Sequence, residues 1–240
     1  MIYVRSALFN VAFFTVTALT AILCLPVLIV GRPVLRSAVA LYARIILWLL
    51  QHIAGIRLEV RGADRLPAGP YVVASKHQSA WETIAFLAIW PDPVFFLKRE
   101  LLYIPLWGWY VARLGMVPVA RAKGGHEIRK MLRLAGRHLP AGRQLIIFPE
   151  GTRRKPADPP DYKPGITALC QMLNLTCVPV ALNSGCYWPR RSFLKHPGQI
   201  VVEILDPIHP GLKRVEFEHR LSDGVETATR RLVAESRRAA

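Results

Sequence analysis

The stretch YVVASKHQSAWETIAFLAI, residues 71–89, indicates the fold more clearly than other parts of the sequence. Its first five residues are apolar or small, as in a buried strand. A polar segment follows at once, and apolar residues then recur at helical spacing as far as Ile89. A strand that leads directly into a helix is typical of an α/β sheet, in which ligand crevices lie at the carboxyl ends of the strands. We therefore expect residues 76–82 to lie at a ligand-binding edge.

Short apolar or β-branched runs elsewhere predict further strands, and helical patterns fall between several of them. Together they predict an α/β domain over residues 56–240, with a mixed, partly parallel β-sheet flanked by helices. The predicted strands are Ile56–Arg61, Tyr71–Ser75, Val94–Leu97, Met116–Val119, Gln144–Phe148, Cys177–Ala181 and Ile200–Leu205. The predicted helices are Thr83–Ile89, Gly125–His138, Ile166–Leu173 and Lys213–Arg238.

The first 55 residues have a different character, and we expect them to form a membrane anchor. The stretch Ala7–Val30 contains no charged residue and is long enough to span a hydrocarbon core, which takes about 20 helical residues. A second apolar run, Val39–Ile56, is interrupted by Arg44 and two other polar residues. This pattern predicts either one spanning helix with an interfacial one, or a two-helix hairpin inserted in one leaflet.

Composition supports a membrane partner. Of the 240 residues, 52% are hydrophobic, and a formal net charge of +16 accompanies a mean hydropathy of +0.26. A chain both apolar and basic suits an anionic membrane surface, and no nucleic-acid-binding motif is present, so we expect no nucleic acid partner. Because cations are more numerous after the first apolar run than before it, the positive-inside rule predicts that the domain lies on the cytoplasmic face of the inner membrane.

The spacing of His77 and Glu82 suggests a base and its orienting carboxylate. Residues five apart on one helix point in different directions, so the two can meet only if His77 precedes the helix, with Ser79 as N-cap. The carboxylate can then hold one imidazole nitrogen while the other takes a proton from an alcohol. The alternative is a surface histidine beside an unrelated glutamate.

Basic residues follow three other predicted strands and suggest a phosphorylated substrate. The segment FPEGTR, residues 148–153, offers close backbone approach at Gly151, donors at Thr152 and a guanidinium fork at Arg153, while Glu150 can hold Arg153 or a substrate hydroxyl. Lys98 and Arg121 follow two further strands. The carboxyl ends of parallel strands share one edge, so these cations should converge on the histidine; a solvated basic face is the alternative.

The sequence resembles the glycerolipid acyltransferases, the 1-acylglycerol-3-phosphate acyltransferase or PlsC-like family. The resemblance runs from about residue 56 to residue 205 and is most specific in the FPEGTR segment. It is carried by four segments in order, His77–Glu82, Lys98–Leu101, Phe148–Arg153 and Val178–Leu182.

The resemblance implies transfer of a fatty acyl group from acyl-CoA or acyl-carrier protein to the free hydroxyl of lysophosphatidic acid at a membrane. It implies that His77 is the general base and that Glu82 orients it. Lys98 and Arg153 would bind the acceptor phosphate, with Arg121 as a weaker candidate, and the segment of residues 150–152 would shape the acceptor site. It implies no metal, no cofactor and no covalent acyl-enzyme.

Two positions depart from the family pattern, in which Asn precedes the histidine and Asp ends the motif. Here Lys76 and Glu82 stand there, and Lys76 can either weaken the base or add a phosphate contact. These departures leave the acceptor open, with lyso-ornithine lipid or another lysolipid as the main alternative. A serine esterase using Ser75 or Ser79, and a non-enzymatic protein that binds anionic lipids, are further alternatives.

Overall fold

The computed structural model describes residues 1–120 and 125–238, and within them seven strands form one mixed sheet. The strand order is β1-β7-β6-β2-β5-β3-β4, and every neighbouring pair is parallel except β6 with β7. This confirms the predicted mixed, partly parallel sheet. The strands are β1 Ile56–Arg61, β2 Val72–Ser75, β3 Pro93–Lys98, β4 Val117–Val119, β5 Gln144–Ile147, β6 Cys177–Leu182 and β7 Gly198–Ile204.

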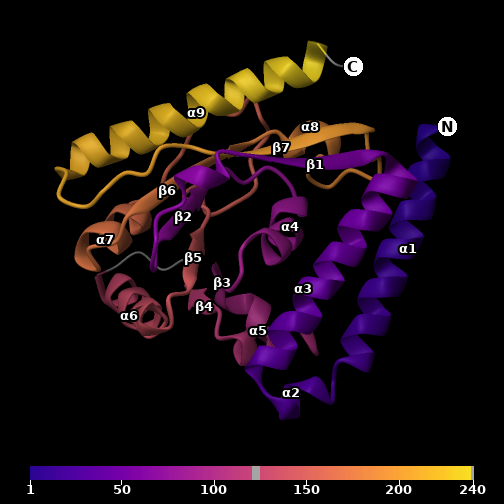
Figure 1. Cartoon of the computed structure of the whole chain (residues 1–240), viewed down its shortest axis with the longest axis horizontal. Helices are drawn as coiled ribbons and strands as arrows, with labels where there is room; N and C mark the ends of the chain where they lie inside the picture. Colours follow the sequence, from indigo (N-terminus) through magenta and orange to yellow (C-terminus); the bar gives the residue numbers. More distant parts are fainter. Residues whose placement is uncertain (121–124, 239–240) are drawn as a thin grey trace.

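Helices cover both faces of the sheet (Figure 1). The main helices of the domain are α4 Trp81–Ile89, α5 Trp107–Leu114, α6 Gly125–Gly136, α7 Gly165–Met172 and α9 Arg214–Arg238; α8, Ser184–Tyr187, is a single turn. Short 3-10 turns occur at Ala63–Arg65, Arg99–Tyr103 and Leu139–Ala141.

Strand β2 shows how the two faces are filled. Val73 packs in the core that also contains residues of α3 and α4, whereas Val72 and Ala74 pack with residues of α6, α7 and α9. Side chains alternate along a strand, so a central strand buried on both faces must be apolar throughout. This is why the opening run of residues 71–75 has no polar member before Ser75.

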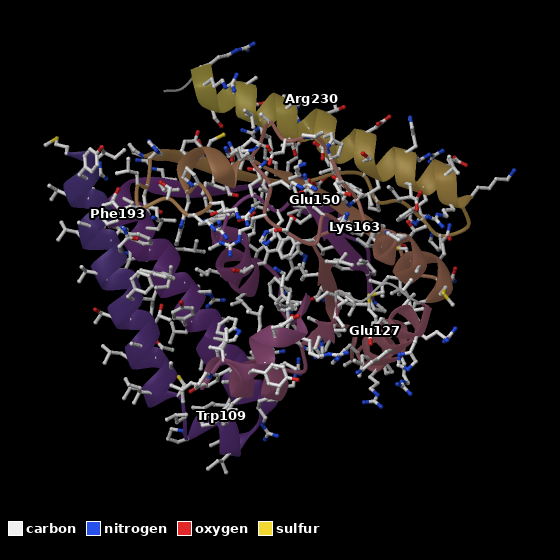
Figure 2. All side chains as sticks on the ribbon, turned by 180° about the vertical axis from the view of Figure 1, so that it is seen from behind. Trp109, Glu127, Glu150, Lys163, Phe193 and Arg230 are labelled. Atoms are coloured by element: carbon white, nitrogen blue, oxygen red, sulfur yellow. The ribbon has the colours of Figure 1, made fainter. Side chains whose placement is uncertain are left out.

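The N-terminal helices form an antiparallel pair along one side of the domain (Figure 1). They are α1 Ile2–Leu23 and α3 Arg32–Leu49, which a π-helical turn extends to Ala54; the short α2, Val27–Val30, lies between them. Both are long and apolar enough to cross a bilayer by length and composition. The side chains that point outward along α1 are mostly hydrocarbon (Figure 2).

The pair is docked onto the domain at both ends. Near its start, the Ser6 hydroxyl accepts the backbone N–H of Lys195 at 2.9 Å, and Phe9 packs edge-on against Trp188. At the other end, the Tyr110 hydroxyl of α5 donates to the carbonyl of Ala21 at 2.6 Å. The helices therefore share the core of the domain instead of projecting away from it.

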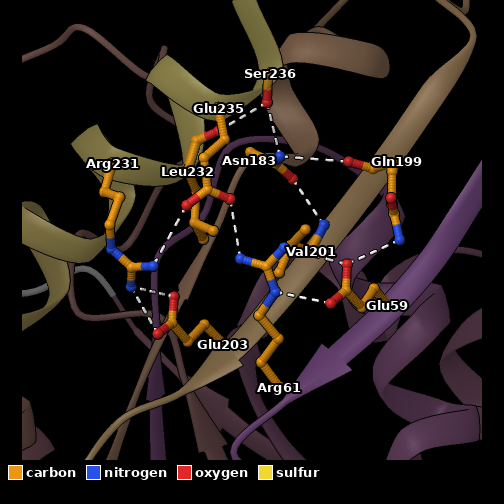
Figure 3. A network of polar contacts seen from close by, with 10 residues as sticks. All are labelled: Glu59, Arg61, Asn183, Gln199, Val201, Glu203, Arg231, Leu232, Glu235 and Ser236. Carbon is orange, nitrogen blue, oxygen red and sulfur yellow. Dashed lines mark hydrogen bonds and ion pairs between the residues drawn. The ribbon is translucent and has the colours of Figure 1, made fainter. Parts of the chain in front are cut away.

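Helix α9 crosses one side of the sheet and is fixed there by a polar network (Figure 3). Arg231 forms two 2.6 Å contacts with Glu203 of β7, and Glu235 accepts from Arg61 of β1 at 2.9 Å. The buried face of α9 is an apolar stripe that includes Phe217, Leu221, Val225 and Leu232.

Candidate active site

Strands β2, β3, β4, β5 and β6 run parallel to one another, so their carboxyl ends meet at one edge of the sheet. The expectation that the segments after these strands share an edge is confirmed for the residues that the structure describes. Segment 76–80 follows β2, segment 148–153 follows β5, and Lys98 ends β3. The candidate site is built on this edge.

His77 lies in the turn before α4, and its ring approaches Glu82 in the first turn of that helix. Nδ1 is 3.5 Å from Glu82 Oε1. The Glu82 side chain is fully buried, whereas the His77 side chain keeps 13% of its surface exposed. The same Oε1 accepts the backbone N–H groups of Gln78 at 2.6 Å and Ser79 at 2.9 Å. Glu82 therefore organises the turn as well as facing the imidazole.

The helix starts slightly later than the predicted Ser79 cap. The structure places Ala80 at the cap position and Trp81 as the first helical residue. The Ser79 hydroxyl still accepts the N–H of Trp81 at 3.1 Å, and Glu82 caps the two amides before it. Since Glu82 reaches back over the turn, it shares with Ser79 the capping that the sequence suggested for serine alone.

Phe148 fixes the other side of the His77 ring. The two rings stack at 4.0 Å between centroids with an interplanar angle of 16°. His77 Nδ1 and Glu82 Oε2 are both buried, and neither has a hydrogen bond of normal geometry within the described residues. A ring held between a carboxylate and an aromatic face has Nε2 left as the nitrogen that can meet a substrate. The role of Phe148 was not predicted, although the residue opens the FPEGTR segment.

The loop after β5 has the backbone geometry expected of a ligand-binding turn. Gly151 adopts a φ of +63°, which glycine tolerates best, and the space where a Cβ would stand is open for 4 Å. Thr152 and Arg153 are half-buried. The Arg153 carbonyl accepts from Arg190 at 2.9 Å, and within the described residues the Arg153 guanidinium has no carboxylate partner.

The two other predicted cations are placed differently. Lys98 stands at the carboxyl end of β3, half-buried and in register with Val119 of β4. One strand, β5, therefore lies between Lys98 and β2. Arg121 lies outside the described residues.

Among the described residues, Glu150 pairs with Lys76 and not with Arg153. Its Oε1 accepts from Lys76 Nζ at 2.8 Å, and both side chains are completely buried (Figure 2 labels Glu150 inside the molecule, below α9). Burial raises the pKa of Glu150, while Lys76 and the neighbouring N–H of His77 oppose that rise. Lys76 Nζ also lies 2.7 Å from Glu226 of α9. The suggested contact between Lys76 and a phosphate is therefore wrong for this structure, because both its partners are protein carboxylates.

Gln78 also has a place that sequence reasoning missed. It is buried, and its side-chain oxygen accepts the N–H of Gly185 at 2.9 Å, which ties the His77 turn to the segment after β6. A polar residue between a candidate base and its carboxylate was the available signal, since buried polar groups are normally hydrogen-bonded.

Comparisons with known proteins identify the family of this chain. Residues 57–183 match the family model described as Acyltransferase. A 1-acyl-sn-glycerol-3-phosphate acyltransferase of Pseudomonas aeruginosa is 39% identical over 175 residues, which cover 72% of this chain and 68% of that protein. A 1-acyl-sn-glycerol-3-phosphate acyltransferase alpha of Mus musculus is 32% identical over 193 residues, which cover 78% of this chain and 67% of that protein.

A solved structure shares the fold. The crystal structure of the 1-acyl-sn-glycerophosphate acyltransferase PlsC from Thermotoga maritima superposes with a TM-score of 0.77 at 20% sequence identity, over 97% of this chain and 98% of that one. At that identity the likeness concerns the arrangement of helices and strands, including the N-terminal pair.

Proposed function

Because this chain belongs to the 1-acyl-sn-glycerol-3-phosphate acyltransferase family, and is thus an acyltransferase, we propose that it acylates the sn-2 hydroxyl of lysophosphatidic acid to give phosphatidic acid. The donor is acyl-CoA or acyl-carrier protein, both of which present the acyl group as a thioester. The observation that carries the proposal is the ring of His77 held between Glu82 and Phe148 at the edge of the sheet where the FPEGTR loop also lies.

In the proposed mechanism His77 acts as general base. Nδ1 faces the Glu82 carboxylate, so Nε2 takes the proton of the acceptor hydroxyl as its oxygen attacks the thioester carbonyl carbon. Glu82 stabilises the imidazolium that forms. The tetrahedral intermediate then collapses, the carbon–sulfur bond breaks, and the imidazolium returns its proton to the thiolate. Apo contacts of this kind often shorten when substrate binds, so a 3.5 Å separation is compatible with the role.

The acceptor phosphate is proposed to bind Arg153 and Lys98, with Arg121 as a further candidate. Gly151 and Thr152 would contribute backbone and hydroxyl donors, because a turn with an open glycine allows close approach of an anion. A guanidinium without a carboxylate partner among the described residues is suited to a phosphate, which it can grip with two parallel hydrogen bonds. Glu150 contributes indirectly, through Lys76.

We also propose that residues 1–55 attach the enzyme to the membrane on its cytoplasmic face. The docking of α1 and α3 along the domain favours a hairpin inserted in one leaflet over a projecting span, because spanning would draw the flanking domain surface into the bilayer. A site beside such a hairpin can receive a lysolipid directly from the leaflet.

The test is acylation by the purified full chain in liposomes, with lysophosphatidic acid and lyso-ornithine lipid as competing acceptors and acyl-CoA or acyl-carrier protein as donor. We expect phosphatidic acid with at least one donor and a higher kcat/KM for lysophosphatidic acid. Preference for lyso-ornithine lipid would reassign the acceptor. Lipid binding without any acyl transfer would favour the non-enzymatic alternative.

A further inference from the structure

A buried cluster of one cation and two carboxylates lies directly behind the candidate base. Lys76 Nζ is 2.8 Å from Glu150 Oε1 and 2.7 Å from Glu226 Oε1. The Tyr162 hydroxyl donates to the same oxygen of Glu226 at 3.1 Å. The Lys76 and Glu150 side chains are fully buried, and that of Glu226 is 12% exposed. A charged lysine is stable there only because both its neighbours are anions.

We propose that Lys76 is a positioning residue for the acyl transfer, which holds the main chain of His77 in place and couples α9 to the site. This inference rests on the proposed function. It assigns a task to Lys76, one of the two positions at which the sequence departs from the family pattern. It also extends the site to α9, which lies outside the FPEGTR segment and the histidine turn.

The alternation of side chains explains why neighbouring residues serve opposite faces. Val72 and Ala74 of β2 point toward the α7 and α9 side of the sheet, and Val73 points toward the α4 side. Lys76 extends that strand pairing, since its N–H donates to the carbonyl of Val180 at 3.0 Å. Lys76 therefore continues the α9 side and meets Glu226, while His77 continues the α4 side and meets Glu82.

The cluster reaches His77 through the loop that follows β5. Glu150 belongs to that loop, and four residues later the N–H of Arg154 donates to the His77 carbonyl at 2.8 Å. The loop returns at Lys163, whose N–H donates to the Pro149 carbonyl at 2.9 Å. Lys76 thus fixes the start of the loop whose Arg154 N–H binds the His77 carbonyl. Phe148, two residues before Glu150, stacks on the His77 ring.

Helix α9 can hold Glu226 in place because other contacts fix the helix to the sheet. Between about one and three turns beyond Glu226, the contacts of Arg231 with Glu203 and of Glu235 with Arg61 hold the helix to β7 and β1 (Figure 3). Glu235 offers a matched control, since it is an ion-paired glutamate on the same helix that does not touch the cluster. Loss of Glu235 perturbs α9 docking, whereas loss of Glu226 also perturbs Lys76.

The experiment compares Lys76→Asn, Glu226→Gln, the double variant Lys76→Asn/Glu226→Gln and the control Glu235→Gln in the full chain. Lys76→Asn leaves two carboxylates facing each other, and we expect kcat to fall by roughly tenfold to a hundredfold with KM for lysophosphatidic acid nearly unchanged. The double variant should regain at least about fivefold of that loss, because removal of Glu226 relieves the repulsion. Glu235→Gln should keep wild-type kcat.

The pH profile separates positioning from a general loss of folded protein. Removing a cation near the base favours its protonated form, so the acid limb of kcat/KM should move to higher pH in Lys76→Asn. Glu226→Gln should move the acid limb to lower pH, and the double variant should return it close to the wild type.

The proposal would be overturned if Lys76→Asn and Glu226→Gln moved the acid limb in the same direction. It would also be overturned by no shift and no rescue in variants that remain folded by circular dichroism. If Lys76→Asn does not fold, the Glu226→Gln and double-variant profiles decide. Absence of phosphatidic acid with wild-type protein would instead overturn the proposed function itself.

Discussion

Replacing Glu82 by glutamine separates its two tasks, which are capping the turn and supporting the base. The amide oxygen of glutamine can still accept the N–H groups of Gln78 and Ser79, which now lie 2.6 and 2.9 Å from Oε1. We expect the free energy of unfolding to change by less than about 1 kcal/mol. Glu82→Ala leaves both buried donors without a partner, which costs about 1–3 kcal/mol for each.

The charge lost in Glu82→Gln should appear in catalysis. Two unit charges 3.5 Å apart interact by about 5 kcal/mol at an effective dielectric constant of about 20. The His77 ring retains 13% exposure and water screens part of this, so we take about 2–3 kcal/mol as the loss of transition-state stabilisation, or roughly 30- to 150-fold in kcat.

The assay is the initial rate of thiol release from acyl-CoA, or of phosphatidic acid formation from acyl-carrier protein, at saturating lysophosphatidic acid. Circular dichroism and thermal unfolding of the same preparations show whether the glutamine variant is folded. A folded Glu82→Gln enzyme with kcat within threefold of the wild type would refute the idea that this carboxylate stabilises the imidazolium.

Three other perturbations follow from the structure. Burial and Arg143 lower the pKa of His138 to about 4, whereas histidine in the unfolded chain titrates near 6.5. The contribution of His138 to the free energy of unfolding should therefore be constant above about pH 6.5 and fall by roughly 1–2 kcal/mol toward pH 4. In unfolding curves recorded against pH, His138→Gln should lose that much less stability than the wild type over this range. A Cβ at Gly108 would stand 1.9 Å from the Leu102 carbonyl oxygen, so Gly108→Ala should cost about 3 kcal/mol and lower the melting temperature by about 6–12 °C, and an unchanged melting temperature would contradict that packing. Ser79→Ala should keep kcat within about threefold of the wild type by the same acyl-transfer assay, whereas a serine esterase would lose on the order of a thousandfold or more.

The strands were predictable because their sequence pattern and their burial coincide. Each of the seven predicted runs overlaps an observed strand, and the parallel ends at one edge follow from the alternation with helices. Helix α5 was missed, since its sequence WGWYVARL begins with aromatic residues and glycine, which favour helix weakly. Its position depends on tertiary contacts such as the bond from Tyr110 to Ala21.

The second N-terminal helix was predicted from Val39 but begins at Arg32. Pro33 lies in its first turn, a position to which proline is well suited because its missing N–H is not needed there. The bend itself occurs at Gly31, whose φ of +144° is accessible to glycine. A proline in the sequence does not by itself show whether it begins a helix or interrupts one.

The sequence predicted which segments form the site, but it did not predict which side chains pair with each other there. The spacing of His77 and Glu82 required a turn between them, and the structure contains that turn. The direction of Glu150 was not accessible, because it depends on a lysine 74 residues away, and Lys76 in turn depends on Glu226, 150 residues further along the chain. Ion pairs over such distances leave no local pattern in the sequence.

The most direct test of the central claim is the acyl-transfer rate of His77→Ala in liposomes that contain lysophosphatidic acid. The substitution removes the base but leaves α1 and α3 intact, so membrane binding in a flotation assay should be that of the wild type. We expect phosphatidic acid formation to fall by about a thousandfold, within the range that a positioned general base contributes. Formation of phosphatidic acid at more than a tenth of the wild-type rate by the folded, membrane-bound variant would contradict the assignment of His77 as the base.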